Sequence, residues 1–310
     1  MGCLVGCLTG VVGHVCEQLA DSSALSVRDP ALCDEDSTGN MLARIFLQVA
    51  VAQTANRSVT VDCAGAGNVF AALFPPVVFA PVAARTKQPT SELCACNHDI
   101  PHACEAGLER AEPHIRSALQ GAALQWRAAN ADAELDEAVI YVRCGDVLRQ
   151  HWHIGYGWLP YSAYTATLDA DTRSIGVLCA PLSGPCRAKD CDFTGDCRML
   201  IEDLIAWLKQ AFPRATVSDR SADDISTAFA RMVLAEQTIC NPSTFCLFPT
   251  IAARGRGYLV ESRLFPFVPR LHGVVVIRAP FVHMGDVAAL TGAGPWTHES
   301  FGLIAERLRA

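Results

Sequence analysis

Hydrophobic positions recur at intervals of three and four residues in several parts of the chain, and this spacing predicts amphipathic helices. The first such stretch lies within residues 39–56, where Met41, Ile45 and Val49 would share one face. Further helices are predicted over residues 105–126, 198–212 and 299–309. Another helix should follow a capping box formed by Ser221 and Asp224, and one more should start at Ser243.

Short apolar runs between these helices predict β-strands. The predicted strands cover residues 58–62, 138–142, 175–180, 215–218, 238–240 and 274–277. Because strands and helices alternate, we expect an α/β fold with a mostly parallel sheet covered on both faces. Residues 64–104 look rich in loops, and the small, polar segment 128–137 predicts a linker. We therefore expect one domain over residues 1–136 and a second over residues 137–310.

The composition indicates a folded protein and limits the classes of partner that it could bind. Of the 310 residues, 51% are hydrophobic and 18% are charged, which allows a large core and excludes general disorder. The net charge of −7 argues against nucleic acid as the main partner. No apolar run reaches the roughly 18–20 residues of a membrane helix. Residues 1–16 are apolar but lack lysine and arginine, so we expect a buried segment rather than a signal peptide.

One candidate motif follows the predicted strand 138–142. Arg143, Gly145 and Asp146 stand at the carboxyl end of this strand, where ligands of open α/β sheets bind. An arginine there can clamp a phosphate through two parallel hydrogen bonds, and the glycine lets the chain turn sharply. The alternative is an ordinary strand end with a surface salt bridge.

A second candidate motif follows the predicted strand 238–240. Asn241 and Pro242 make a turn that leaves Ser243 and Thr244 at the start of a helix. Backbone N–H groups and the helix dipole favour an anion at such a position. The alternative is that Ser243 only caps the helix. Together the two motifs describe a pyrophosphate pocket better than either does alone.

These motifs support a family resemblance. Arg143-Cys-Gly-Asp146 followed by Tyr156-Gly-Trp-Leu-Pro160, together with Cys240-Asn-Pro-Ser-Thr-Phe245, resembles the conserved stretches of alpha-1,2-fucosyltransferases and their relatives. The resemblance implies a GT-B-like architecture, that is, two Rossmann-like domains with mostly parallel sheets. It also implies inverting, metal-independent transfer of fucose from GDP-fucose to a glycan or glycoprotein hydroxyl, with no cofactor. The expected location is the secretory pathway, in the Golgi lumen.

The resemblance also implies roles for individual residues, which are carried over by position. The catalytic residues would be Arg143 and Asp146, with Arg143 also neutralising the β-phosphate of GDP. The expected donor-binding residues are Arg143, Gly145, Ser243, Thr244, Phe245 and Asp224. The expected acceptor-binding residues are Gly39, Asn40, Tyr156 and Tyr164.

The chain departs from the family pattern in two places near these motifs. The family has a histidine two residues before the arginine, and this chain has Tyr141. The family also has an acidic residue in the helix before the Ser-Thr-Phe motif, and the nearest acids here are Asp223 and Asp224. Both departures favour a rival function, a non-catalytic relative that binds a nucleotide sugar or a glycan.

No metal ligand is assigned, although two clusters contain ligand types. Asp169 and Asp171 form an Asp-x-Asp pair, but the pair precedes a predicted strand, and we expect a solvated helix end. The segment 94–104 holds three cysteines and two histidines and allows either zinc binding or disulfides with surface histidines. A zinc-stabilised interaction protein is therefore a second rival. Neither His151 nor His153 is assigned as a catalytic base.

Fifteen cysteines are many for a cytosolic enzyme. If the chain matures in the secretory pathway, we expect most of them to be oxidised and Asn56 to be available for glycosylation. A bridge is expected between Cys186 and Cys197. Cys240 and Cys246 either form a disulfide across the second motif or pack as small apolar groups.

Overall fold

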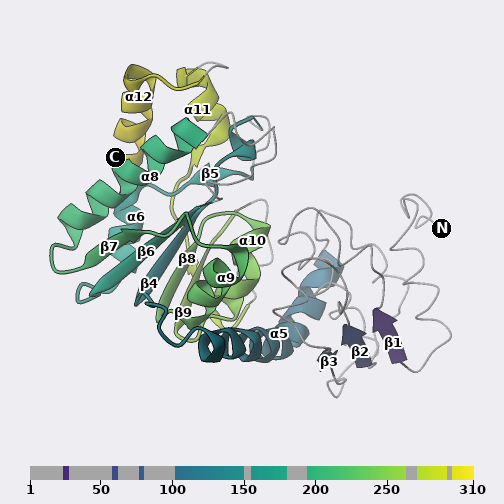
Figure 1. Ribbon diagram of the computed structural model, residues 1–310. Helices are drawn as coiled ribbons and strands as arrows, with labels where there is room; N and C mark the ends of the chain where they lie inside the picture. Colours follow the sequence, from purple (N-terminus) through teal and green to yellow (C-terminus); the bar gives the residue numbers. More distant parts are fainter. Residues whose placement is uncertain are drawn as a thin grey trace, which may run out of the picture. The chain divides into compact units, whose positions relative to one another are not determined.

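The computed structural model describes residues 24–27, 58–61, 77–79, 102–149, 155–179, 194–262, 271–291 and 295–310 (Figure 1). The chain divides into two compact units, Met1–Ala122 with Arg270–His272, and Ala123–Pro269 with Gly273–Ala310. The helix predicted within residues 39–56, including Gly39 and Asn40, lies outside the described residues. The domain boundary after residue 136 and the GT-B arrangement of two Rossmann-like domains stay predictions.

The first unit contains a small sheet. Strand β1 (Ala24–Val27) pairs in parallel with β2 (Ser58–Val61), which pairs antiparallel with β3 (Val77–Phe79). The sheet is therefore mixed, and β2 is the strand predicted over residues 58–62. Helix α5 (His102–Ala129) begins in this unit and covers the predicted helix 105–126.

The second unit contains a six-stranded sheet in which every pairing is parallel. Its spatial order is β10-β9-β8-β4-β6-β7. The strands are β4 (Ala138–Val142), β6 (Ser174–Cys179), β7 (Thr216–Asp219), β8 (Gln237–Cys240), β9 (Arg256–Val260) and β10 (Val274–Ile277). The α/β class and the parallel sheet predicted for this part of the chain are confirmed. Strand β9 was not predicted.

The order of the strands defines where a ligand would bind. The chain builds β4, β6 and β7 toward one edge, then returns to the other side of β4 for β8, β9 and β10. Numbered along the chain, the order is 3-2-1-4-5-6, the order of Rossmann folds. The direction of winding changes between β4 and β8, and ligands of such sheets bind beyond the carboxyl ends of the two strands that flank this switch point.

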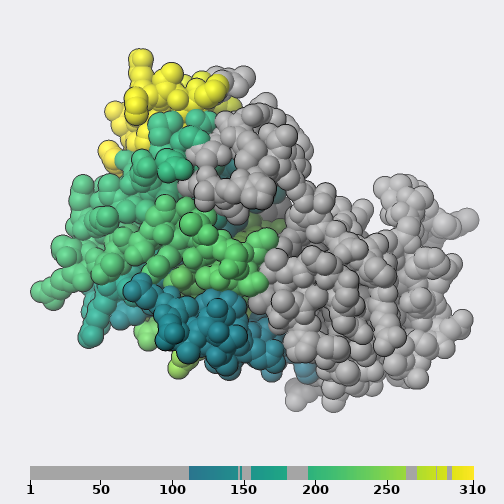
Figure 2. Space-filling view, viewed as in Figure 1, coloured from purple at the N-terminus to yellow at the C-terminus, as the bar shows by residue number. Residues whose placement is uncertain are grey.

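The helices of the second unit lie on both faces of its sheet (Figure 1). They are α6 (Tyr161–Thr167), α8 (Thr194–Ala211), α9 (Ile225–Leu234), α10 (Thr244–Ile251), α11 (Met284–Thr291) and α12 (His298–Arg309). Helix α8 contacts β6, β7, α6 and α12, whereas α9 contacts α10, which contacts β8 and β9. In the space-filling view, green residues and the yellow residues near the C-terminus form much of the coloured surface on this side (Figure 2).

The main core lies between the sheet and α8. Ala138, Ile140 and Val142 of β4 belong to one buried cluster with inward-facing leucines of α8, among them Leu204 and Leu208. Side chains alternate between the two faces of a strand. The intervening Val139 and Tyr141 therefore point toward the opposite face, although both are buried.

Helix α9 begins differently from the prediction. Asp224 is itself the N-cap, because its carboxylate accepts hydrogen bonds from the backbone N–H and the hydroxyl of Thr227, at 2.9 and 2.8 Å. The predicted capping box, with Ser221 as the cap, is therefore wrong. The helix starts three residues later, and the backbone N–H of Ser221 instead donates to Asp219 at 2.8 Å.

Two short elements complete the second unit. Residues Asp146–Arg149 form a 3-10 turn, and β5 (Gly157–Trp158) pairs antiparallel with β11 (Val282–His283). Among the residues that the structure describes, no helix combines the length and the hydropathy needed to cross a membrane.

Candidate functional site

The two predicted motifs leave the sheet side by side. Strands β4 and β8 are neighbours in parallel register, and Tyr141 is paired with Cys240. The segments that follow, with Arg143 after β4 and Ser243 after β8, therefore emerge at the same edge and on the two sides of the switch point. The sequence predicted two separate strand ends, and the structure brings them together. The chemical roles assigned to their residues stay predictions.

Asn241 holds these two strand ends together. Its side-chain Nδ2 donates to the backbone oxygen of Tyr141 and to the hydroxyl of Tyr164, each at 2.9 Å. Its Oδ1 accepts from the backbone N–H of Leu159 at 3.2 Å. Asn241 is fully buried, so these bonds replace the water that its amide would otherwise bind. Sequence analysis treated Asn241 only as part of a turn and missed this role.

Ser243 caps helix α10. Its side chain accepts a hydrogen bond from the backbone N–H of Phe245 at 3.3 Å. The helix then runs from Thr244 for eight residues, and its N-terminus lies at the edge of the sheet where β8 ends. Capping by Ser243 is therefore observed. Phosphate binding by Ser243 and Thr244 stays a prediction.

Tyr141 lies between the two motifs. Its ring centroid is 5.3 Å from that of Phe245. Burial raises the pKa of its hydroxyl, while the charge of Arg143 opposes that rise. Burial dominates, so the hydroxyl is neutral at physiological pH. The residue that departs from the family pattern thus packs against the first turn of α10 and lies close enough to Arg143 for that charge to act on its hydroxyl.

The loop after β4 is shaped by Gly145 and by a disulfide. Gly145 has a φ of 85°, a conformation that glycine adopts without the strain other residues would bear. Cys144 is bonded to Cys197 in the first turn of α8, with Cα atoms 5.8 Å apart. The backbone oxygen of Arg143 accepts from the indole Nε1 of Trp158 at 2.8 Å. The side chain of Asp146 lies outside the described part of the structure.

The predicted bridge between Cys186 and Cys197 is wrong, because Cys197 is bonded to Cys144. The first turn of α8 lies at the end of β4, where the backbone N–H of Gly145 also donates to Cys197 Sγ at 2.9 Å. Cys186 falls outside the described residues. The prediction relied on closeness in sequence, whereas the sheet sets the spatial neighbours.

A second disulfide spans the turn after β8. Cys240 and Cys246 are bonded, with Cα atoms 5.5 Å apart, so the first of the two alternatives for this pair is confirmed. The bridge encloses Asn241 and Ser243. Because disulfides persist in oxidising compartments, the two bridges fit a secreted or lumenal protein.

The remaining predicted site residues lie in different surroundings. Tyr164 is buried, and its hydroxyl is bonded to Asn241. Tyr156 is half-buried and packs against the main core. Asp224 caps α9, which follows the edge strand β7 rather than a strand at the switch point. No observation links these three residues to a ligand, and their binding roles stay predictions.

The Asp-x-Asp pair lies at the opposite edge of the sheet. Asp169 and Asp171 precede β6, and the carboxylate of Asp169 forms an ion pair with Arg256 at the start of β9. Within the described ranges, no group of three or more His, Cys, Asp or Glu side chains is arranged to hold a metal ion. The side chains of the cysteine–histidine segment 94–104, and residues 151 and 153, are not among those described.

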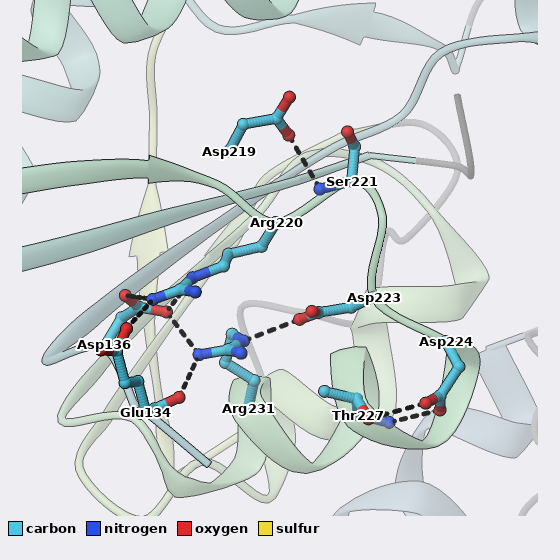
Figure 3. A network of polar contacts seen from close by, with 9 residues as sticks. All are labelled: Glu134, Asp136, Asp219, Arg220, Ser221, Asp223, Asp224, Thr227 and Arg231. Atoms are coloured by element: carbon cyan, nitrogen blue, oxygen red, sulfur yellow. Dashed lines mark hydrogen bonds and ion pairs between the residues drawn. The ribbon is translucent and has the colours of Figure 1, made fainter. Parts of the chain in front are cut away.

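A network of buried charges lies at the start of β4 (Figure 3). Asp136 accepts from Arg231 of α9 at 2.7 Å through one oxygen and from Arg220 at 3.0 Å through the other. Arg231 also donates to Asp223 at 2.8 Å, and Figure 3 shows its guanidinium between the two carboxylates. Gly176 of β6 makes room for the Asp136 carboxylate, because a Cβ at this position would overlap it. The network joins β4, the end of β7 and α9.

The comparisons with known proteins give one distant neighbour. No protein-family model and no curated protein matches the chain. Among solved structures, the chain is similar to the crystal structure of POFUT1 in complex with GDP, at 15% identity and a TM-score of 0.26. The match covers 52% of this chain and 46% of that chain, so this chain spans about half of its neighbour. A likeness with so low a TM-score carries no argument about fold or function.

Proposed function

We propose that the chain is a glycosyltransferase that takes fucose from GDP-fucose. One observation carries the proposal: Arg143 and the N-terminus of α10 emerge from the two strands that flank the switch point of a Rossmann-ordered sheet. These are the segments whose sequence resembles alpha-1,2-fucosyltransferases. The fold and the resemblance thus point to the same edge of the sheet, by independent routes.

The proposed catalysis depends on stabilising the negative charge that develops on the leaving group. An acceptor hydroxyl would attack the fucose carbon from the face opposite GDP, the bond to the β-phosphate would break, and the configuration would invert. Negative charge grows on the leaving diphosphate during this step. Arg143, the backbone N–H groups at the start of α10 and the hydroxyls of Ser243 and Thr244 are the groups that would stabilise it. We assign no residue as the base for the acceptor proton.

The other parts of the proposal rest on the resemblance. Asp146 and Gly145 would shape the arginine loop, Phe245 and Asp224 would complete the donor site, and the acceptor would be a glycan or glycoprotein. Transfer would need no metal and no cofactor, so chelation by EDTA should leave it intact. The two disulfides support maturation in the secretory pathway, and the Golgi lumen is the proposed location.

The test is a binding and transfer assay. Isothermal titration with GDP, UDP, CMP and the corresponding sugar nucleotides should give a preference for GDP and GDP-fucose. Replacing Arg143 with alanine should abolish transfer, because losing such a group costs about 2–4 kcal/mol of transition-state stabilisation. Arg143→Lys should recover little, since lysine lacks the two-pronged geometry of arginine. Near-normal transfer by Arg143→Ala would overturn the proposal.

A second candidate function is a relative that binds GDP-fucose without turnover. The observation that favours it is Tyr141, a buried residue of β4 that stands where the family has a histidine. The same titrations separate the two functions. Tight GDP-fucose binding with no release of GDP, across a panel of glycan and glycoprotein acceptors, would favour the non-catalytic relative.

A further inference from the structure

The side chain of Trp158 anchors the backbone of Arg143. Its indole Nε1 donates a hydrogen bond to the backbone oxygen of Arg143 at 2.8 Å. Trp158 is 1% exposed, so water hardly competes for this bond. Arg143 is the first residue after β4, and the next residue, Cys144, is bonded to Cys197. The chain at Arg143 is therefore held by a side chain at one residue and by a disulfide at the next.

The backbone around Trp158 is itself held on two sides. In the pairing of β5 with β11, Trp158 lies opposite Val282. The two strands approach closely, because a Cβ at Gly157 would lie 2.8 Å from the backbone oxygen of Val282. On the other side, the backbone N–H of Leu159 donates to Oδ1 of the buried Asn241 at 3.2 Å. Trp158 thus stands on a short, firmly placed strand.

The ring of Trp158 packs against a second tryptophan. The ring centroids of Trp158 and Trp296 are 5.9 Å apart, and the rings meet edge to face at 87°, a favourable aromatic geometry. The backbone N–H of Trp296 donates to Asp196 at 2.9 Å. Asp196 precedes Cys197, the disulfide partner of Cys144. These contacts lead back to the loop after β4, so each of them limits the movement of the others.

We propose that Trp158 is a positioning residue, which fixes the backbone of Arg143 so that the guanidinium is directed at the β-phosphate of a bound nucleoside diphosphate. This inference rests on the proposed function and goes beyond it, because the family resemblance gives Trp158 no role. Trp158 acts through Arg143, so its effect should be confined to ligands that have a β-phosphate.

An anchor on the backbone suits a phosphate-binding arginine. The bond from Trp158 uses the carbonyl of Arg143 and takes none of the five N–H donors of its guanidinium. The side chain is long, so a shift of its backbone displaces the guanidinium, and misplacement by about 1 Å can weaken a site about 100-fold. A segment that is already held in place also loses less conformational entropy when the ligand binds.

The experiment compares GDP with GMP by isothermal titration for the unsubstituted protein, for Trp158→Phe and for a matched control. Trp207→Phe is the control, because the Nε1 of Trp207 has no hydrogen-bond partner in the described structure and its ring packs against Tyr161. We expect Trp158→Phe to weaken GDP about tenfold and to leave GMP unchanged. Trp207→Phe should change neither affinity.

A double-mutant cycle distinguishes positioning from general damage. Arg143→Ala keeps the backbone oxygen that Trp158 binds, so the stability lost in Trp158→Phe, measured by urea unfolding, should be the same in both backgrounds. Its effect on GDP affinity should disappear in the Arg143→Ala background. A loss of GDP affinity that persists there, an unchanged GDP affinity or equal weakening of GMP would each overturn the inference.

Failure of the proposed function gives a different result from failure of this inference. If the unsubstituted protein shows no preference for GDP over GMP, both fail. If it does, and Trp158→Phe keeps that preference, only the inference fails.

A second substitution covers the case in which Trp158→Phe does not fold. Benzothienylalanine at position 158 has nearly the shape of tryptophan but carries sulfur in place of the N–H donor. The same tenfold loss for GDP alone is expected, and an unchanged GDP affinity would overturn the inference.

Discussion

A buried aspartate lies near each end of β4, and the two carboxylates differ in how completely they are hydrogen-bonded. Near the amino end, Asp136 is bonded to Arg231 and Arg220, so its charge is compensated on both oxygens (Figure 3). Near the carboxyl end, Asp196 is the neighbour of Cys197, which is bonded to Cys144. One oxygen of Asp196 accepts from the backbone N–H of Trp296 at 2.9 Å, and the other has no hydrogen-bond partner in the described structure.

The difference separates a part of the sheet that stabilises the fold from a part that is suited to function. Buried polar groups are nearly always hydrogen-bonded, and exceptions are expected mainly at functional or strained sites. Asp136 follows this rule. Asp196 breaks it, and the bond between Cys144 and Cys197 holds it close to the segment that carries Arg143.

The largest expected effect is a loss of folding stability when Asp136, near the amino end of β4, is replaced. Asp136→Asn leaves two arginines without their carboxylate, and Arg231 is only 4% exposed. Breaking such a buried pair costs about 3–5 kcal/mol. Urea unfolding should show this loss, with GDP affinity unchanged in whatever fraction is folded.

Asp169→Asn is the matched control for this variant. Its ion pair with Arg256 is about half exposed on both sides, at 44% and 50%, and such pairs contribute about 0–1 kcal/mol. Equal losses in the two variants would mean that the Asp136 network is no more stabilising than a surface pair.

The second prediction concerns the two disulfides of the carboxyl end. The bond from Cys144 to Cys197 spans 53 residues and the bond from Cys240 to Cys246 spans 6. In the chain-entropy account, the longer bridge stabilises the fold by about 4 kcal/mol and the shorter by about 2 kcal/mol. Paired cysteine-to-serine variants, compared by urea unfolding, should keep this order. The reverse order would show that strain or residual structure outweighs loop entropy.

The third prediction sharpens the contrast between stability and binding. Ser243→Ala together with Thr244→Val should weaken GDP at least tenfold, because charge-assisted hydrogen bonds contribute about 1.5–3 kcal/mol each. The folded state should lose only about 1 kcal/mol, the usual cost of a lost N-cap. A lower melting temperature with unchanged GDP affinity would mean that both residues serve only the helix.

The smallest expected effect is on the pH dependence of stability. Burial raises the pKa of the Asp196 carboxyl, against an opposing hydrogen bond from the Trp296 backbone. The folded protein therefore binds this proton more tightly than the unfolded chain does. The resulting stability is present below the usual aspartate pKa and is lost as the pH rises through the raised value.

Asparagine at position 196 would not titrate. The stability of Asp196→Asn relative to the unsubstituted protein should therefore increase between about pH 3 and about pH 7. Urea unfolding at both values measures this difference. A difference that stays constant with pH would show that the pKa of Asp196 is not raised in the folded protein.

The sequence predicted those parts of the fold that depend on local pattern. The runs at residues 138–142 and 175–180 are uniformly apolar, and such runs mark strands that are buried on both faces. Strand β9 was missed because it starts with Arg256 and Gly257, neither of which is typical of a strand. Gly257 lies so close to the backbone of Thr250 that a Cβ would overlap it, a constraint that only the folded chain reveals.

The candidate site was predictable at its two strand ends but not in its connections. Parallel neighbours bring their carboxyl ends to one edge, so locating Arg143 and Ser243 there required only the strand assignment and the strand order. The hydrogen bond from Asn241 to Tyr141 and the ion pair of Asp136 with Arg231 join residues far apart in sequence. Cysteines are chemically alike, so the sequence could not pair Cys197 with Cys144 rather than with Cys186.

The bridge between Cys144 and Cys197 also has a consequence for biosynthesis. At about 5–20 residues per second, ribosomes need roughly 3–10 s to make the 53 residues that separate the two cysteines. Cys179, Cys186 and Cys191 emerge during that interval. If thiols oxidise in order of appearance, Cys144 meets three wrong partners before the right one. The yield of active protein should therefore depend on a disulfide isomerase that exchanges the early bonds for the native one.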